Sequence, residues 1–363
     1  MRHPAKPLQV VCQRVRDAPR WLLNRQQTGL VLVILALAVV LTAFSGTHVD
    51  RRSGAAVNNF LNSGTLMQVA TDASFFAVMA IGATIVIISG GIDLSVGSVY
   101  AVAGVTMALV LRSPPQGPLQ TVGVGILVSL GIGLICGVIN GLMIVGLRVH
   151  SFVITLGTMW IFRGIAFVTS RATSVLVPDA LTGVAKANFG LGPGLYPMPM
   201  AVMIVVTLCG AIYLSHTVMG RHVFAVGGNV EASRYAGLRI ERIQLGVFAL
   251  SGLAAGIAAF MGTSYYGSAS CADASGYELY VIASAVVGGA SLKGGRGSAV
   301  SATLGALLIV LIRQSIRSLR LDQNYEWIII GCAIIVAVVL DRVSTALTSR
   351  RLTAVGDTHH RGG

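Results

Sequence analysis

The chain has 363 residues, of which 54% are hydrophobic and only 11% are charged. Because a soluble domain carries about 25% charged residues, this composition excludes a large water-soluble domain and predicts an all-α polytopic membrane protein. The formal net charge of +13 indicates basic loops that face the cytoplasm rather than nucleic-acid binding. The five cysteines are scattered without a CxxC pair, so no zinc site or disulfide framework is expected.

About ten apolar runs follow one another along the chain, and a membrane-spanning helix needs ~20 apolar residues. The third and eighth runs are short, which predicts broken or re-entrant helices. With the N-terminus inside, alternation also places most basic loops inside, so both termini are predicted to be cytoplasmic. The predicted spans are 29–46, 65–89, 95–111, 120–146, 150–170, 198–216, 243–262, 277–291, 298–318 and 325–341.

The membrane domain is predicted over residues 29–345, between a basic cytoplasmic tail at 1–28 and a second cytoplasmic tail at 346–363. The first apolar run lacks a convincing cleavage site, so we expect it to remain as a span rather than to be removed as a signal peptide. A long loop at 170–199 contains NFGLGPGLYPMP, whose glycines and prolines prevent a regular helix through its middle.

A polar interval at 217–242 separates two apolar runs and contains its own helix signals. Asn229 suits the N-cap position, Glu231 falls in the first turn, and Gly237 suits a left-handed C-cap. The interval therefore predicts a short helix over Val230–Ala236, held outside the bilayer. An ordered helix between two spans is expected to dock on another protein.

The first candidate helix break is GGIDLSVGS, which interrupts apolar sequence with two glycines and a carboxylate. Asp93 is expected to cap a following helix whose first turn runs from Leu94 to Gly97. The alternative is that this ionisable side chain serves as a transported-ion or proton site. The break and pathway candidates in this stretch are Gly90, Gly91, Asp93, Ser95 and Gly97.

The second candidate break is GGASLKGGRGS, in which Gly288 and Gly289 precede two basic residues. It lacks the GK[ST] ending of a phosphate-binding loop, so we interpret it as a tight turn. Its likeness to the first break fits either a distant internal repeat or chance. Just upstream, Tyr277 and Glu278 open a short apolar run, where Glu278 either caps a helix or faces a polar cavity. No catalytic or metal-binding motif is found, so the chain is not expected to be an enzyme.

Four motifs resemble those of the ribose-type ABC transporter permeases. AVGGNVEASRYAGLRI, at 225–240, is similar to the family signature (Y/A)AxGGNxEAARLSGI. GGIDLSVGS at 90–98, FVITLGTMWIFRGIA at 152–166 and GYEL…VVGGASLKGGRGS at 276–298 resemble three further motifs, and the matches run in order from about residue 60 to residue 342. The resemblance implies the inner-membrane subunit of a bacterial importer for a sugar of the ribose, xylose, arabinose or galactose type.

The resemblance also implies partners. These are an ATPase subunit with two cassettes, a periplasmic binding protein, and a second copy of the chain or a related permease. The chain itself would hold no cofactor, since the ATPase uses ATP and Mg, and it would lie in the lipid bilayer without binding nucleic acid. The implied ATPase-coupling residues are Gly227, Gly228, Asn229, Glu231, Ala232, Ser233, Arg234, Tyr235 and Gly237. Tyr235 replaces a family Leu, and Tyr280 stands where members often carry Asp.

The implied mechanism is that nucleotide binding at the ATPase switches two packings of the membrane helices. An ion-coupled secondary transporter of a small polar solute is the alternative, and it would need intramembrane carboxylates. The apolar runs hold very few of these, namely Asp72, Asp93, Glu278 and Glu326. That scarcity favours the ABC importer. The side-chain pattern does not indicate which sugar is carried.

Overall fold

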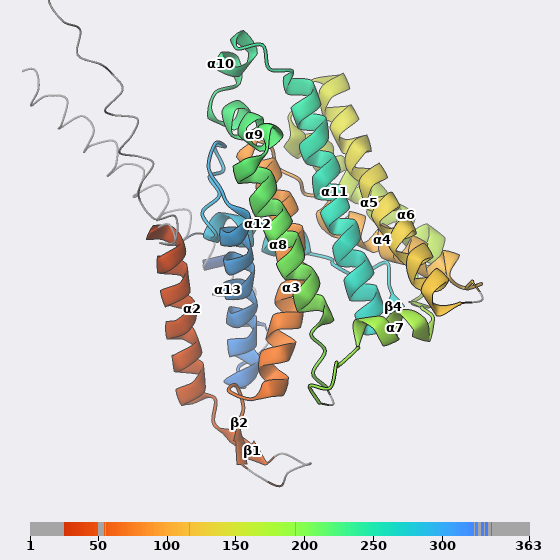
Figure 1. Cartoon of the computed structure of the whole chain (residues 1–363), viewed down its shortest axis with the longest axis vertical. Coiled ribbons are helices and arrows are strands. Elements are labelled where there is room, and N and C mark those ends of the chain that lie inside the picture. Colours follow the sequence, from red (N-terminus) through yellow and green to blue (C-terminus); the bar gives the residue numbers. More distant parts are fainter. Residues whose placement is uncertain are drawn as a thin grey trace, which may run out of the picture.

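The computed structural model describes residues 25–49, 54, 56–115, 117–192, 194–322 and scattered positions between 324 and 335. These residues form a bundle of helices with two very short sheets (Figure 1). The helices are α2 (Arg25–Phe44), α3 (Ser63–Ile88), α4 (Val96–Val110), α5 (Pro118–Leu147), α6 (Ser151–Ser170), α7 (Asp179–Ala185), α8 (Met198–His216), α9 (Val218–Gly228), α10 (Val230–Tyr235), α11 (Ile240–Tyr266), α12 (Tyr277–Val287) and α13 (Ala299–Ser318).

Both sheets are antiparallel pairs of two or three residues per strand. Strand β1 (Thr47–Val49) pairs with β2 (Ala56–Asn58), which closes the connection between α2 and α3. Strand β3 (Val175–Leu176) pairs with β4 (Ser268–Ala269), which joins the segment after α6 to the segment after α11. The β1–β2 pair and α7 lie at the opposite end of the bundle from α9 and α10 (Figure 1).

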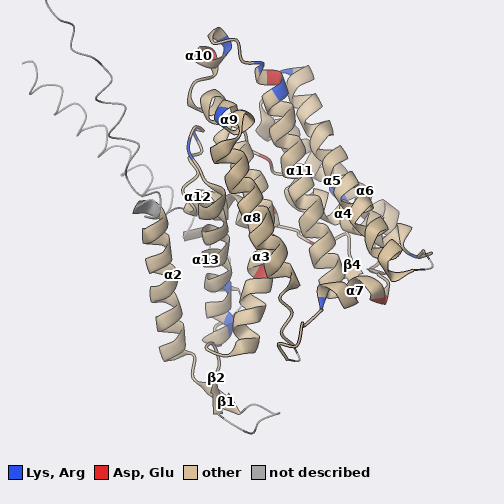
Figure 2. Ribbon diagram, viewed as in Figure 1, with Lys and Arg blue, Asp and Glu red and all other residues tan. Residues whose placement is uncertain are grey.

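The lengths of the apolar helices confirm a polytopic membrane protein. Within the described part of the chain, seven helices are long and apolar enough to cross a membrane: α2, α3, α5, α6, α8, α11 and α13. Helices α4 and α12 have 15 and 11 residues, as the short runs at 95–111 and 277–291 predict. The run at 325–341 lies outside the continuously described residues. Charged residues gather mainly at the two ends of the bundle (Figure 2).

Helix α3 forms the centre of the bundle and packs against α8, α11, α12 and α13. Of its most apolar stretch 94% is buried, against 11% for α2 and 17% for α8. A face of apolar helix left open in one chain is stable against lipid or against a second copy, but not in water. The outer helices therefore present the surface that the membrane or a partner covers.

Helices α5 and α11 approach each other along facing stripes of glycine. A Cβ atom placed on Gly133 or Gly137 of α5 would overlap the backbone of α11, at Gly252 and at Phe248 respectively. The same overlap arises in the other direction at Gly252 and Gly256. Small residues allow this close backbone contact, which replaces the hydrophobic driving force that helices lack within a bilayer.

Two helices lie where the sequence predicts loop. Helix α9 occupies the first half of the polar interval at 217–242. Thr217 caps it by accepting the backbone N–H of Gly220 at 3.0 Å, and its apolar residues Val223 and Val226 are buried. Helix α7 lies within the long loop at 170–199, before the stretch whose glycines and prolines prevent helix. Both are short helices stabilised by packing against the bundle, which a search for long apolar runs does not detect.

Candidate functional site

Helix α10 has the local structure that its sequence predicts. The Asn229 side chain accepts the backbone N–H of Ala232 at 2.9 Å, which caps the helix at its start. Gly237 has φ +81°, and the N–H of Leu238 then bonds the carbonyl of Ser233 at 3.0 Å. The predicted helix over Val230–Ala236 is therefore confirmed, with its last helical residue one position earlier, at Tyr235.

The helix projects from one end of the bundle, next to α9 (Figure 1). Ser233 is its one buried residue, and the side chain of Tyr235 is 93% exposed. Most of the implied coupling residues share this exposed position: Gly228, Asn229, Glu231, Ala232, Arg234, Tyr235 and Gly237. Helix α10 is therefore an exposed helix that is capped at both ends.

Gly227 lies at the base of this projection, in contact with both candidate helix breaks. A Cβ atom there would overlap the carbonyl oxygen of Ile88, the last residue of α3 before Gly90 and Gly91. The backbone N–H of Gly295 donates to that same oxygen at 2.9 Å. The structure thus brings together three glycine-containing segments, and we call this contact of Ile88, Gly227 and Gly295 the glycine junction.

Asp93 is buried at the first break, in a complete set of hydrogen bonds. Its Oδ1 accepts the N–H and the hydroxyl of Ser95 at 2.9 and 2.7 Å, and its Oδ2 accepts the hydroxyl of Ser251 on α11 at 2.7 Å. Asn140 of α5 donates to the Ser95 hydroxyl at 2.7 Å. The carboxylate therefore joins α4, α5 and α11.

The expected capping of α4 by Asp93 is wrong in its details. The helix begins at Val96 rather than Leu94, and its N-cap Ser95 makes no side-chain capping bond within the helix. Asp93 instead bonds the N–H of Ser95, one residue before the helix starts. Helix α6 provides acceptors for two further backbone N–H groups of the break that have no helical partner. The hydroxyls of Ser151 and Thr155 accept from Ile92 and Leu94 at 3.0 and 3.1 Å. Non-helical backbone within a membrane protein needs such partners.

The first break also meets the start of α12, at Gly97. A Cβ atom on this residue would lie 2.5 Å from the carbonyl oxygen of Ala274 and 2.8 Å from Glu278 Oε2. Glu278 lies in the first turn of α12, but the N-cap is Gly276 and no side-chain capping bond forms. The capping role expected for Glu278 is therefore wrong, and its carboxylate faces the start of α4 instead.

The remaining predicted positions lie around α12. Tyr277 packs against Phe76 of α3, with ring centroids 4.5 Å apart and the ring planes inclined at 40°. Gly288 ends α12, and a Cβ atom there would overlap the carbonyl of Ser301 on α13. Gly289 has φ +94°, so it provides the sharp turn predicted for the second break. The pathway candidates thus belong to one connected region rather than to separate sites.

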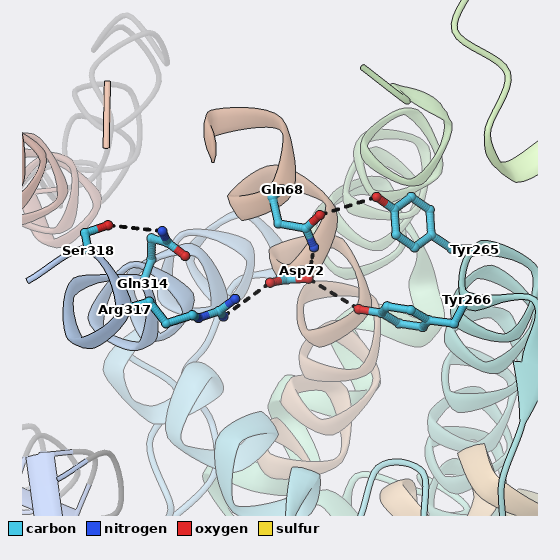
Figure 3. A network of polar contacts seen from close by, with 7 residues as sticks. All are labelled: Gln68, Asp72, Tyr265, Tyr266, Gln314, Arg317 and Ser318. Atoms are coloured by element: carbon cyan, nitrogen blue, oxygen red, sulfur yellow. Dashed lines mark hydrogen bonds and ion pairs between the residues drawn. The ribbon is translucent and has the colours of Figure 1, made fainter. Parts of the chain in front are cut away.

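Sequence reasoning missed a polar network between α3, α11 and α13 (Figure 3). Asp72 of α3 accepts from Gln68 at 2.7 Å and from the Tyr266 hydroxyl at 3.4 Å, and it pairs with Arg317 of α13 at 3.5 Å. The sequence did contain a signal for this network, because Asp72 is an isolated charge in one apolar run and Arg317 is an isolated charge at the end of another. Their separation of 245 residues in the chain hides the pairing.

Long apolar helices, interrupted helices at the centre and an exposed capped helix at one end are the features of a membrane transport protein. Within the described residues, no group of three or more His, Cys, Asp and Glu side chains could hold a metal ion. Residues 65–338 match the family model described as branched-chain amino acid transport system / permease component. The chain therefore belongs to this family of permease components.

Curated relatives are similar over nearly their whole length. The ribose import permease of Escherichia coli K12 is 30% identical over 334 residues, which cover 92% of this chain and 98% of the relative. The D-allose permease of the same organism is 34% identical, with coverage of 78% and 85%, and its L-arabinose permease is 31% identical, with coverage of 87% and 90%. No solved structure matches significantly.

Proposed function

We propose that the chain forms the transmembrane path of an ATP-driven sugar importer in the bacterial cytoplasmic membrane. A periplasmic binding protein delivers the sugar, and a separate ATPase subunit with two cassettes hydrolyses ATP with Mg. Support comes from relatives named for ribose import and for allose and arabinose transport. The family description names branched-chain amino acids, so the sugar assignment rests on these relatives.

The observation that carries the energy-coupling part of the proposal is α10 with the glycine junction at its base. The helix is exposed and capped, and at its base backbone contact of Gly227 connects it to the end of α3 and to the second break. A displacement of α10 is therefore transmitted to the membrane segments through backbone contacts, which no change of side-chain rotamer can break. Two copies of the chain would enclose the path, with the open apolar faces against lipid or against each other.

The test is reconstitution of the chain with its ATPase and binding protein in liposomes. We expect ATP-dependent uptake of ribose, allose or arabinose, and ATPase activity that rises when the sugar-loaded binding protein is added. Uptake of leucine in place of every sugar would overturn the sugar assignment. Uptake driven by an ion gradient without ATP would overturn the importer itself.

The docking role of α10 has its own test. Glu231→Arg and Gly228→Trp change exposed positions and should leave the permease in the membrane, while stimulation of the ATPase falls at least about tenfold. The control is Val168→Ala on α6, which removes a 78% exposed apolar side chain near the other end of the bundle. Undiminished stimulation in both α10 variants would exclude docking at this helix.

A further inference from the structure

Six of the nine tyrosines of the chain gather at the end of the bundle opposite α10. Their rings, with those of two phenylalanines of α3, form contacts with centroids 4.5 to 6.5 Å apart. We call this group the tyrosine-rich cluster. Its rings belong to Phe75, Phe76, Tyr100, Tyr196, Tyr265, Tyr266, Tyr277 and Tyr280.

The polar network of Asp72 lies beside these rings (Figure 3). The hydroxyl of Tyr265 reaches Gln68 at 3.4 Å, and that of Tyr266 reaches Asp72 at the same distance. The guanidinium of Arg313 lies 5.1 Å from the ring centroid of Tyr280, and Arg317 faces Asp72. Donors, acceptors and aromatic faces thus occur together where α3, α11, α12 and α13 meet.

The network differs from a structural one in its packing. Asp93 elsewhere in the chain is 3% exposed, and its three hydrogen bonds measure 2.7 to 2.9 Å. In contrast, the side chain of Arg317 is 47% exposed, and its contact with Asp72, like that of Tyr266, is 3.4 Å or longer. The side chain of Asp72 is 14% exposed and accepts from Gln68 at 2.7 Å, so the hydrogen-bonding capacity left for a ligand lies mainly on the exposed Arg317 guanidinium and at the long contacts.

The chemistry of the network selects a ligand class. The carboxylate of Asp72 and the guanidinium of Arg317 are paired, so their charges offset each other, while the guanidinium of Arg313 lies over the faces of Phe76 and Tyr280. Carboxylate, guanidinium, amide and phenol groups instead suit adjacent hydroxyl groups, which both donate and accept. The aromatic faces suit the C–H groups on a sugar ring, since small-molecule sites combine aromatic walls with a few placed polar groups.

We infer that Gln68, Asp72, Tyr266 and Arg317, with the rings of the tyrosine-rich cluster, form a contact site for a neutral polyhydroxylated ring on its way through the permease. This inference rests on the proposed sugar import and assigns residues to it. A carboxylate and a half-exposed guanidinium beside six tyrosines in an otherwise apolar bundle are best accounted for by a polar solute that passes them.

The test uses the complete transporter in liposomes, with ATP inside and the loaded binding protein outside. The variants Asp72→Asn, Tyr266→Phe and Arg317→Gln should each lower ribose and allose uptake about tenfold, as loss of a hydrogen bond to a charged group predicts. ATPase stimulation by the loaded binding protein should persist, so that transport per ATP falls. Tyr266 is 58% exposed, so its variant tests the site without risk to folding.

Two controls separate a binding site from a structural clamp. Arg320→Gln removes an exposed charge at the same end of α13 and should transport like the wild type. The exchange Asp72→Arg with Arg317→Asp restores an ion pair in the opposite orientation, and we expect it to recover assembly but not uptake.

Full recovery of uptake in the exchange, or wild-type uptake in Tyr266→Phe and Asp72→Asn, would overturn the contact site. Neither result would contradict sugar import by the wild type, so the experiment distinguishes a failure of the contact site from a failure of the proposed function. Leucine uptake by the wild type, lost in the same variants, would show an amino-acid site instead.

Discussion

Gly227 is a residue at which one methyl group should have a large effect. Its added Cβ would overlap the Ile88 carbonyl oxygen, which is backbone and cannot rotate away. We therefore expect Gly227→Ala to destabilise the protein by about 3 kcal/mol, at the upper end of ordinary overpacking. Gly228→Ala is the matched control, because no atom lies within 4 Å of its added Cβ. Thermal unfolding in detergent measures both, and equal melting temperatures would contradict the close contact.

Asp93 gives a second prediction for a single residue. Its carboxylate accepts three hydrogen bonds, and an amide can largely replace them. The amide oxygen can still accept from Ser95, and the NH₂ group can donate to the Ser251 hydroxyl, which reverses the direction of that bond. We expect Asp93→Asn to retain folding and most transport, with a loss of about 1 kcal/mol. Asp93→Leu should lose folded protein, because it strands the buried N–H and hydroxyl of Ser95 and the hydroxyl of Ser251.

Size-exclusion profiles and uptake distinguish the two Asp93 variants. If Asp93→Asn folds normally yet abolishes uptake, the negative charge is required and the structural role is insufficient.

Single residues also show how far local sequence reasoning reaches. The caps of α10 could be predicted because Asn229 and Gly237 act on backbone groups two to four residues away. The pairing of Asp72 with Arg317 could not, because it depends on how α3 and α13 pack. The partner of Asp93 on α11 was hidden for the same reason.

Among the elements, α5 and α11 offer the sharpest test of packing. Gly137 on α5 faces the backbone of α11, whereas Gly131 on the same helix has no atom within 4 Å of an added Cβ. Gly137→Val should therefore push the helices apart and lose folded protein, while Gly131→Val should be retained. Both changes have the same size and helix propensity, so propensity cannot explain a difference. The measurement is the amount of monodisperse protein, and equal yields would contradict the glycine contact.

The lengths of the helices could be predicted from the sequence where the apolar runs are long. They could also be predicted at α4 and α12, because glycine-rich breaks shorten these two helices. The polar interval was less transparent. Helix α9 carries Arg221 and His222 between apolar residues, a pattern that predicts loop, although Thr217 caps a helix there. Its buried side, at Val223 and Val226, became visible only through packing on the bundle.

For the whole molecule, the orientation in the membrane remains a prediction with a direct test. Both the projecting α10 and the glycine junction are expected on the cytoplasmic side, and the loop after α7 on the periplasmic side. In a cysteine-free background, Tyr235→Cys should react with a membrane-impermeant thiol reagent only in inside-out vesicles. Phe189→Cys, 72% exposed near the opposite end, should react only in intact cells. The reverse pattern would invert the proposed topology.

The glycine junction has a consequence for partner choice. It connects α10 to the broken helices through backbone atoms of Ile88, Gly227 and Gly295, so no exposed side chain of α10 takes part. The outward residues of α10 are then free to diverge with a different ATPase while the connection stays the same. Under the proposed function, a chimera that carries the α10 surface of another permease should couple to that permease's ATPase and still transport its own sugar.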